Sequence, residues 1–369
     1  MSINHFIYIK SNIFAKFVTH NMLLYVHFSG GNDMKRRKRL YRKNKQKKLI
    51  IIFLCTVLCF MVVGYSAFST RINLTAKGNI KDKSRVIQRW NVYSDEDFHT
   101  DFYKENIVSV TFLDNVIVPS NAVEKWDVSE SKDHGVMAYV IESTSETGKY
   151  DLYIEAKGGV IANANSSYLF DNFTEIKSIS FDNNFDTSTS TDMSFMFHLC
   201  HSLTKLDLSG FDTSNVTTMQ SMFNMWDAGN TASELIYLDV SSFDTSNVTN
   251  MRDMFADLLK LTSLDVSHFN TGNVTDMWHM FYECASLTSL DVSNFDTKKV
   301  TNMEGMFCEC RNLSILNLCS FDVSGVTNSV GMFKHMTNLN YVYVNDDFNI
   351  GADYLFANSN ISSVTKGMC

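Results

Sequence analysis

Residues 261–312 decide the fold: they read LTSLDVSHFNTGNVTDMWHMFYECAS and then LTSLDVSNFDTKKVTNMEGMFCECRN. The second unit of 26 residues keeps most apolar positions of the first. The dipeptide Met-Phe marks the same period along the chain, because its Phe stands at 197, 223, 255, 281, 307 and 333, at spacings of 26, 32, 26, 26 and 26 residues. Such a period is typical of a stacked repeat, whose units cannot bury an apolar face alone.

Each unit combines a strand-like pattern with a helix-like one. Leu290 and Val292 alternate with Asp291, which predicts a strand with the Asp side chain outward. Met303, Met306 and Phe307 follow at i, i+3 and i+4, the spacing of one helix face. Asp-Thr pairs at 212, 244 and 296 supply turn residues in a chain with one proline. We therefore expect an α/β leucine-rich-repeat-type solenoid of about seven coils.

The full pattern L-x-x-L-D-V-S-x-F-D-T-S-N-V-T-x-M-x-x-M-F-x-x-C resembles the repeat of BspA-like leucine-rich-repeat surface proteins of bacteria. The resemblance covers about residues 176–345. It implies surface display and binding of host or neighbouring-cell partners. Upstream segments that begin at Ile107 and Tyr150 resemble the β-rich N-terminal cap of that family. Asn317 and Tyr343 depart from the Asp of the motif, which suggests a closing C-terminal cap.

The net charge of −8 conceals two opposite segments. Residues 34–48 hold ten Lys or Arg, whereas residues 71–369 hold 20 basic and 39 acidic residues, a net of 20 − 39 = −19. Between them, residues 49–68 carry no charge and would span ~30 Å as a helix, the thickness of one bilayer core. This pattern predicts either a cleaved signal peptide or a signal-anchor transmembrane helix. Both alternatives place residue 71 onward outside the cytoplasm.

Four segments follow from these patterns. Residues 1–33 are a mis-called start or an extension, because Met34 followed by basic residues is a typical start of an export signal. Residues 34–70 form the basic region and the export helix. Residues 71–175 form the β-rich N-terminal cap. Residues 176–369 form the solenoid with its C-terminal cap.

No catalytic, cofactor or metal motif stands in the sequence, so we expect neither an enzyme nor a cofactor. His198 and His201 flank Cys200 and have a metal-like spacing. However, Cys200 occupies the same position of its unit as Cys284 and Cys310, which favours a small apolar core slot over zinc. A net charge of −19 on residues 71–369 argues against a nucleic-acid partner.

Positions that differ between units are the better guide to a partner, because a ligand is usually met by a few unequal side chains. Six extra residues lie around Met225–Asn230, and aromatic or His side chains stand out in the neighbouring units. The outward Asp column forms either a solvated face or a stripe for cations. Trp226 alternatively fills the Cys200-type core slot. The candidate binding residues are Tyr237, Asp239, Asp265, His268, Trp278, His279, Asp291 and Trp226.

The sequence thus predicts a non-enzymatic protein of the bacterial surface or a secreted one, which binds protein or cell-surface ligands as an adhesin-like module. Membrane attachment would depend on an uncleaved residue 49–68 helix. The alternative is a structural protein whose solenoid associates with copies of itself. A hydrolase within residues 80–170 is a third hypothesis, but His99 and His134 have no nucleophile motif beside them.

Overall fold

The computed structural model describes residues 83–89, 104–228, 232–351, 353–367 and 369. The chain divides into two units, Met1–Lys81 and Asp82–Cys369, and every described residue lies in the second. The predicted segments 1–33 and 34–70 therefore lie outside the described residues.

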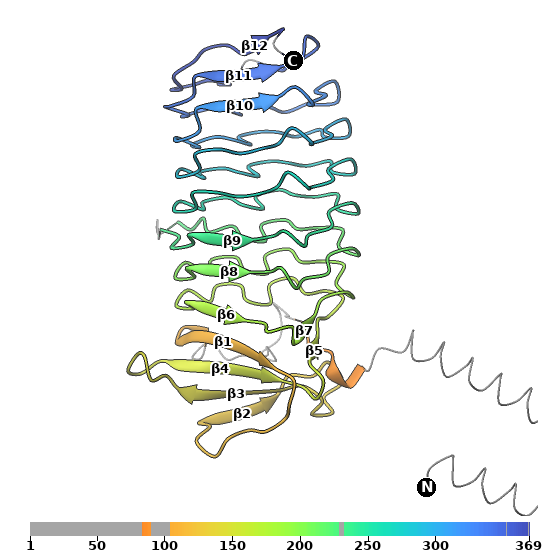
Figure 1. The fold of residues 1–369 in the computed structure, drawn as a ribbon, viewed down its shortest axis with the longest axis vertical. Coiled ribbons are helices and arrows are strands. Elements are labelled where there is room, and N and C mark those ends of the chain that lie inside the picture. Colours follow the sequence, from red (N-terminus) through yellow and green to blue (C-terminus); the bar gives the residue numbers. More distant parts are fainter. Residues whose placement is uncertain (1–82, 90–103, 229–231, 352, 368) are drawn as a thin grey trace, which may run out of the picture. The chain divides into compact units, whose positions relative to one another are not determined.

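The described unit is a column of coils that stack in parallel (Figure 1). Each coil contributes one short strand or extended segment to the same face. The pairing is in register, since Leu206 lies opposite Leu238 and Leu316 lies opposite Val342. The strands are β6 (Ser178–Ser180), β8 (Lys205–Asp207), β9 (Tyr237–Asp239), β10 (Ile315–Leu318), β11 (Tyr341–Val344) and β12 (Thr365–Lys366).

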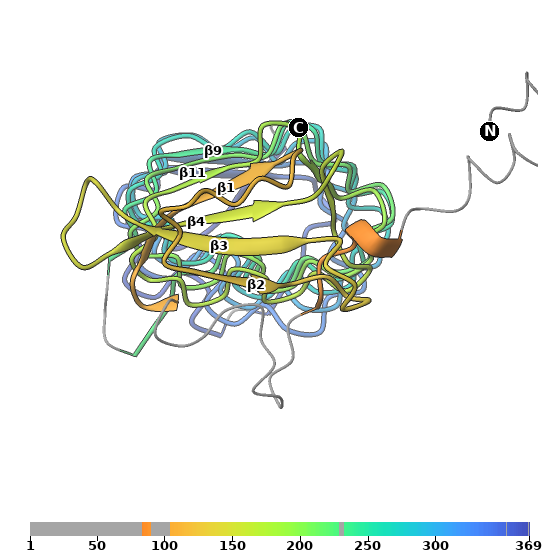
Figure 2. The ribbon, with the colours of Figure 1, turned by 90° about the horizontal axis from the view of Figure 1, so that it is seen from below.

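A five-stranded sheet covers the first end of the column. Its order is β2-β3-β4-β1-β6, and the pairing of β1 with β6 joins it to the first coil. Seen from below, β1 to β4 lie across the end of the stack (Figure 2), where they cover backbone groups that would otherwise be exposed. The strands are β1 (Ile107–Leu113), β2 (Glu124–Asp127), β3 (Met137–Glu142) and β4 (Tyr150–Glu155), with the small pair β5 (Val160–Ile161) and β7 (Phe185–Asp186) beside them. The expected cap boundary at residue 175 stays a prediction.

The predicted α/β class is wrong. The only helical element that the described residues form in full is the 3-10 turn η1 (Lys83–Arg85). Where Met303, Met306 and Phe307 predicted a helix, the chain makes successive turns instead. The cause is a left-handed residue at every fourth position, for example Asp253 and then Asp257, with φ of 53° and 62°. A right-handed helix cannot continue through such residues.

The backbone N–H groups of this segment bond to the next coil rather than within a helix. Phe255 N donates to Met280 O at 3.0 Å, and Asp257 N donates to Tyr282 O at 2.8 Å. Side chains spaced by three and four residues still reach the interior, because each four-residue turn returns the chain to the same face. The pattern predicted the buried face correctly and the backbone conformation wrongly.

Phenylalanines form a continuous column inside the stack. Phe223 and Phe255 stack with ring centroids 5.6 Å apart, and Phe255 and Phe281 follow at 5.7 Å. Each of these rings is fully buried. Aromatic stacking and the burial of apolar surface therefore hold neighbouring coils together along the whole interior.

Corners of the coils are made by Asp and Asn side chains. In one coil, Asp239, Asp244 and Asn250 each accept a hydrogen bond from the backbone N–H two residues ahead, at 2.9 to 3.0 Å. Asx turns of this kind turn a chain without proline.

A buried threonine ties each coil to the next. Thr245, 1% exposed, donates its hydroxyl to Asn270 O at 3.0 Å and accepts Asn270 N at 2.8 Å. An exposed threonine four residues later makes a single bond, from Thr249 Oγ1 to Thr217 O at 3.1 Å. The buried threonine therefore satisfies two backbone groups where water has little access.

Replacing Thr245 by Val keeps the side-chain shape but removes both bonds to Asn270. We expect Thr245→Val to lower the free energy of unfolding by about 1–3 kcal/mol, the cost of leaving buried polar groups unsatisfied. Thr249→Val is the matched control and should cost less than about 1 kcal/mol, because water replaces its bond. Urea unfolding followed by circular dichroism measures both. Equal losses would contradict this role of the buried threonine.

The predicted transmembrane or signal helix at residues 49–68 lies outside the described residues. Within the part of the chain that the structure describes, no helix is long and apolar enough to cross a membrane. The expected membrane-spanning helix therefore has no counterpart among the residues that the structure describes.

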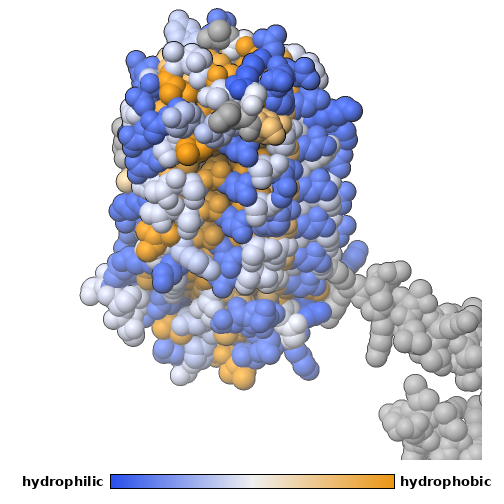
Figure 3. Space-filling model, turned by 45° about the horizontal axis from the view of Figure 1, so that its top comes forward, coloured by the Kyte–Doolittle hydropathy of each residue, from blue (hydrophilic) through white to orange (hydrophobic). Residues whose placement is uncertain are grey.

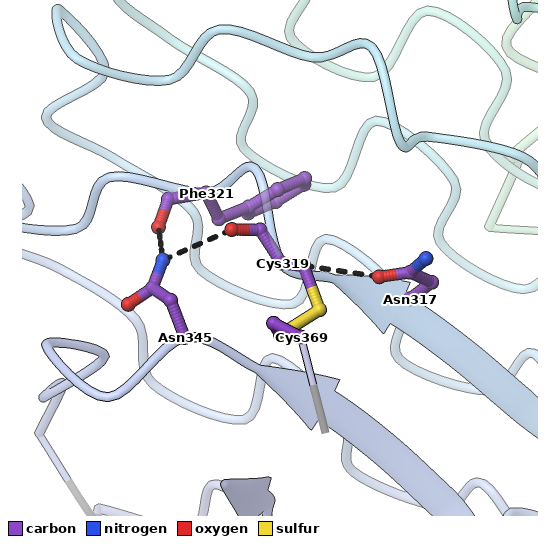
Figure 4. Close-up of a disulfide and its surroundings, with 5 residues drawn as sticks. All are labelled: Asn317, Cys319, Phe321, Asn345 and Cys369. Atoms are coloured by element: carbon purple, nitrogen blue, oxygen red, sulfur yellow. Dashed lines mark hydrogen bonds between the residues drawn. A yellow bond between two sulfur atoms is a disulfide. The ribbon is translucent and has the colours of Figure 1, made fainter. Parts of the chain in front are cut away.

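A disulfide between Cys319 and Cys369 fastens the last coils (Figure 4). Its Cα atoms are 5.6 Å apart and it closes 50 residues of chain. Beside it, Asn345 Nδ2 donates to the carbonyl oxygens of Cys319 and Phe321 at 3.2 and 2.8 Å. Cys284 and Cys310 are buried and free. The end of the stack is thus fixed covalently.

Cys319→Ser should destabilise the protein by up to about 4 kcal/mol, the loop entropy of a closure of this length. The double variant Cys319→Ser/Cys369→Ser should lose no more than the single variant, since one bond is involved. Thermal unfolding under oxidising and reducing conditions checks this. A wild-type melting temperature that is insensitive to reductant would contradict it.

Candidate functional site

The candidate residues divide between two faces of the stack. Tyr237, Asp239, Asp265 and Asp291 line a shallow depression of about 420 Å³ on the strand face. Trp226, Trp278 and His279 line a second groove, of about 520 Å³, on the face formed by the four-residue turns. His268 lies near the first set and contacts Val240 O through Nε2 at 3.1 Å. The sequence prediction did not separate these two groups.

The Asp column of the strand face serves the coils themselves. Asp265 Oδ1 accepts from Ser267 N at 3.0 Å and from its hydroxyl at 2.7 Å, and Asp291 does the same with Ser293. These hydrogen bonds from serine lower the pKa of Asp265 and Asp291 below the usual value. The carboxylates are therefore charged and engaged in the turns that end the strands, which favours the solvated-face alternative.

Several residues that differ between the repeat units line the groove on the face formed by the four-residue turns. We call it the Trp groove and define it by Asn224, Trp226, Arg252, Asp257, Trp278 and Tyr282 among its lining residues. Trp226 lies among the six extra residues and is 58% exposed, so it does not fill the Cys200-type slot. Its backbone N–H donates to Asn224 Oδ1 at 2.7 Å. The insertion thus places an exposed indole at one wall of the groove. Figure 3 shows mostly polar atoms over the stack in its view, with apolar atoms gathered in a narrow strip.

A row of stacked rings forms the opposite wall. The Arg252 guanidinium lies 3.8 Å from the centroid of Trp278. Trp278 and His279 stack at 3.8 Å, and His279 and Tyr282 stack at 4.5 Å. Cation–π and ring stacking hold these side chains in fixed orientations. Trp278 and His279 are both half-buried.

Gly305 leaves space for the ring of His279 in this row. A Cβ at Gly305 would lie 2.4 Å from Cδ2 of His279. Its φ of 55° is not the reason for glycine, since Asp253 and His279 hold similar values in the equivalent positions of other coils. The close approach of the His279 ring therefore requires Gly305, and it seats His279 beside Trp278.

Two buried acids lie at the floor of the groove. Asp253 is 9% exposed and Asp257 is 8% exposed. Burial raises the pKa of Asp253 to about 7, although Arg252 Nε at 3.4 Å partly offsets the effect. Burial, together with the Glu283 carboxyl, raises the pKa of Asp257 to about 8. Burial also lowers the pKa of His279 to about 4, so its ring is neutral at pH 7. The sequence analysis did not select Arg252, Asp253 or Asp257, although their departure from the neighbouring units was a usable signal.

No cluster of three or more His, Cys, Asp or Glu side chains in the described segments has the arrangement of a metal site. Cys200 is fully buried, and its thiol donates to Phe170 O at 3.1 Å. His201 Nε2 contacts Met225 O at 2.9 Å, and His198 Nδ1 contacts Asp171 at 2.6 Å. The two histidines thus point to different partners.

Asp257→Asn should stabilise the protein at high pH. Because the folded-state pKa of Asp257 is raised, its favourable contribution is complete below about pH 4 and is lost as the pH rises through about 8. Asparagine escapes this loss, so the melting temperature of the variant relative to wild type should rise by several degrees between pH 4 and pH 9. Asp291→Asn, whose parent carboxyl has a lowered pKa, should show no such rise in this range, because the contribution of Asp291 is complete above about pH 4 and is lost only as the pH falls further. Thermal scans across this pH range test both, and parallel curves for Asp257→Asn and wild type would contradict the assignment.

Comparison with known proteins gave one family match. The model of a family described as "Mycoplasma protein of unknown function, DUF285" matches residues 164–234 and 224–346. No curated protein and no solved structure matches the chain. The two matched segments together span residues 164–346, so most of the stacked coils are similar to this family.

Proposed function

We propose that this protein is a non-enzymatic binding protein of the bacterial surface or secreted medium, which captures protein or cell-surface partners in the Trp groove. The carrying observation is that three unusual aromatic side chains, Trp226, Trp278 and Tyr282, line one groove. Exposed tryptophan beside fixed arginine and tyrosine is the composition of binding hot spots.

Two further observations support the proposal. The disulfide Cys319–Cys369 suits an oxidising compartment, because such bonds seldom persist in the cytosol. The resemblance of the 26-residue pattern to BspA-like surface proteins implies the same location and a role in attachment. The DUF285 family description gives no function of its own.

Binding to intact cells tests the proposal. Labelled full-length protein should bind host epithelial cells or neighbouring bacterial cells saturably in flow cytometry. The variant Trp226→Ala/Trp278→Ala should bind at least tenfold more weakly, since hot-spot aromatics each contribute about 2 kcal/mol or more. Tyr237→Ala, which removes an exposed aromatic of the strand face, is the matched control and should bind as wild type does. Absence of saturable binding to either cell type, or equal binding by all variants, would contradict the proposal.

Self-association is a weaker candidate function. Strand β2 ends the order of its sheet, yet three of its four residues are charged, and it reads Glu-Lys-Trp-Asp. Short charged strands at a sheet edge oppose edge-to-edge pairing. A purified protein that stays monomeric at high concentration would exclude self-association.

A further inference from the structure

The sheet that caps the stack has an outer face, turned toward the viewer in Figure 2, and a carboxyl is buried on that face. In β4, Ile154 and Ala156 belong to the apolar core, so Glu155 between them points to the outer face. Glu155 is nevertheless 0% exposed. Within the described residues, neither of its carboxyl oxygens accepts a hydrogen bond of normal geometry. An ionised carboxyl in this position is costly, because water does not solvate its charge.

The connection from β1 to β2 covers this carboxyl. Strands β4 and β3 lie between β1 and β2 in the sheet, so residues 114–123 must pass them on one face or around the end. The inner face is occupied by the core of the stack. The backbone N–H of Ile117 is near enough to Glu155 to favour its charged form, which places the connection beside the carboxyl on the outer side. We call residues 114–123 the cap strap.

The cap strap is held mainly at its two ends. Gly158 N donates to Asp114 O at 2.9 Å, and Val123 N donates to Val140 O at 2.9 Å. Between these anchors, the bond from Ala122 N to Pro119 O at 3.1 Å is internal to the strap. Strap residues Val116 and Ile117 are 47% and 74% exposed. The middle of the strap can therefore leave the sheet with little loss of hydrogen bonds or buried apolar surface.

An aromatic ring shares the covered space with Glu155. Tyr139 of β3 is 4% exposed, and its ring stacks on that of Tyr153 at 5.0 Å. Burial and then the charge of Glu155 raise the pKa of Tyr139 to about 12. Exposure of Tyr139 to solvent is therefore a measure of whether the strap covers the sheet.

The charged groups around this face do not compensate a carboxylate at Glu155. Burial raises the pKa of Glu155, and the Ile117 N–H offsets the effect only in part. Asp151, on the same face of β4, is engaged with Ser109 Oγ at 2.6 Å. The other titratable side chains of the strap and of the neighbouring strands on this face are Asp114, Lys125, Asp127, Tyr139 and Tyr153.

We propose that the cap strap is a pH-dependent flap, which lifts from the outer face of the cap sheet when Glu155 ionises and thereby uncovers Tyr139. In the covered state the pKa of Glu155 is raised, so this state is most stable below the usual carboxyl pKa and loses stability as the pH rises through the raised value. Opening then levels off, because Glu155 is ionised in both states. The flap lies on the cap and is independent of the Trp groove.

The experiment is hydroxyl-radical footprinting of the full-length protein between pH 4 and pH 8, with mass spectrometry. Oxidation of Tyr139 is measured relative to that of Tyr354, which is 73% exposed and reports the radical dose. We expect this ratio to rise at least about threefold with pH, because the flap opens as Glu155 ionises. Cleavage by proteinase K within residues 114–123 should increase over the same range.

Two variants make the result specific to Glu155. Glu155→Gln cannot ionise, so its Tyr139 oxidation should stay low at every pH, and its strap should be cut more slowly than that of the wild type at pH 8. Asp151→Asn changes a carboxyl of the same strand and face and should respond to pH as the wild type does. Glu155→Met, of similar length, replaces Glu155→Gln if that variant does not fold.

Three results would overturn the inference. The first is Tyr139 oxidation that does not change with pH in the wild type. The second is an equal rise in the variant without the Glu155 carboxyl. The third is a rise that coincides with loss of the circular dichroism signal, since the flap opens while the stack stays folded.

Discussion

The hydrogen bonds between backbones of successive coils, offset by one repeat, are the constraint on which this structure depends. Asp253 N bonds to Trp278 O and His279 N bonds to Glu304 O, and isolated bridges run in the same way from Asn165 to Asn328. This register places equivalent residues above one another at the spacing of neighbouring strands. An insertion is tolerated only where it leaves the register unchanged, and Leu206 still pairs with Leu238 although extra residues separate them in the sequence.

Register turns the repeat into columns of like side chains. Inside, the column of phenylalanines supplies the apolar core, and at the corners Asx turns and buried threonines satisfy the backbone. The side chains of these columns already hold the coils together. A partner must therefore bind where a different residue interrupts a column. Arg252, Asp253, Trp278 and His279 are such interruptions, and they lie in adjacent coils of one face.

Much of the stack could be predicted from the sequence, because the repeat period and the alternation of apolar residues are visible in the order of the residues. The inward Leu290 and Val292 and the outward Asp291 lie as the alternation indicated. The prediction of a helix after each strand was wrong. The i, i+3, i+4 spacing of Met303, Met306 and Phe307 also arises from turns with a left-handed residue at every fourth position. The disulfide was missed because Cys319 and Cys369 are 50 residues apart and the pattern of the last coil is irregular. The sequence selected Trp226 and Trp278 but not Asp257, whose pKa depends on burial that only the folded stack reveals.

The central claim is that coils are equivalent in their backbone and that binding depends on the unequal side chains of a few of them. Removal of residues 287–312 tests it most directly, because this coil does not line the Trp groove and the next coil repeats its essential groups. Gly331, with φ of 61°, would replace Gly305 beneath His279. We predict that the shortened protein unfolds cooperatively at a lower temperature and binds intact cells as the full chain does. A shortened protein that does not fold, or one that folds and loses cell binding, would contradict the account.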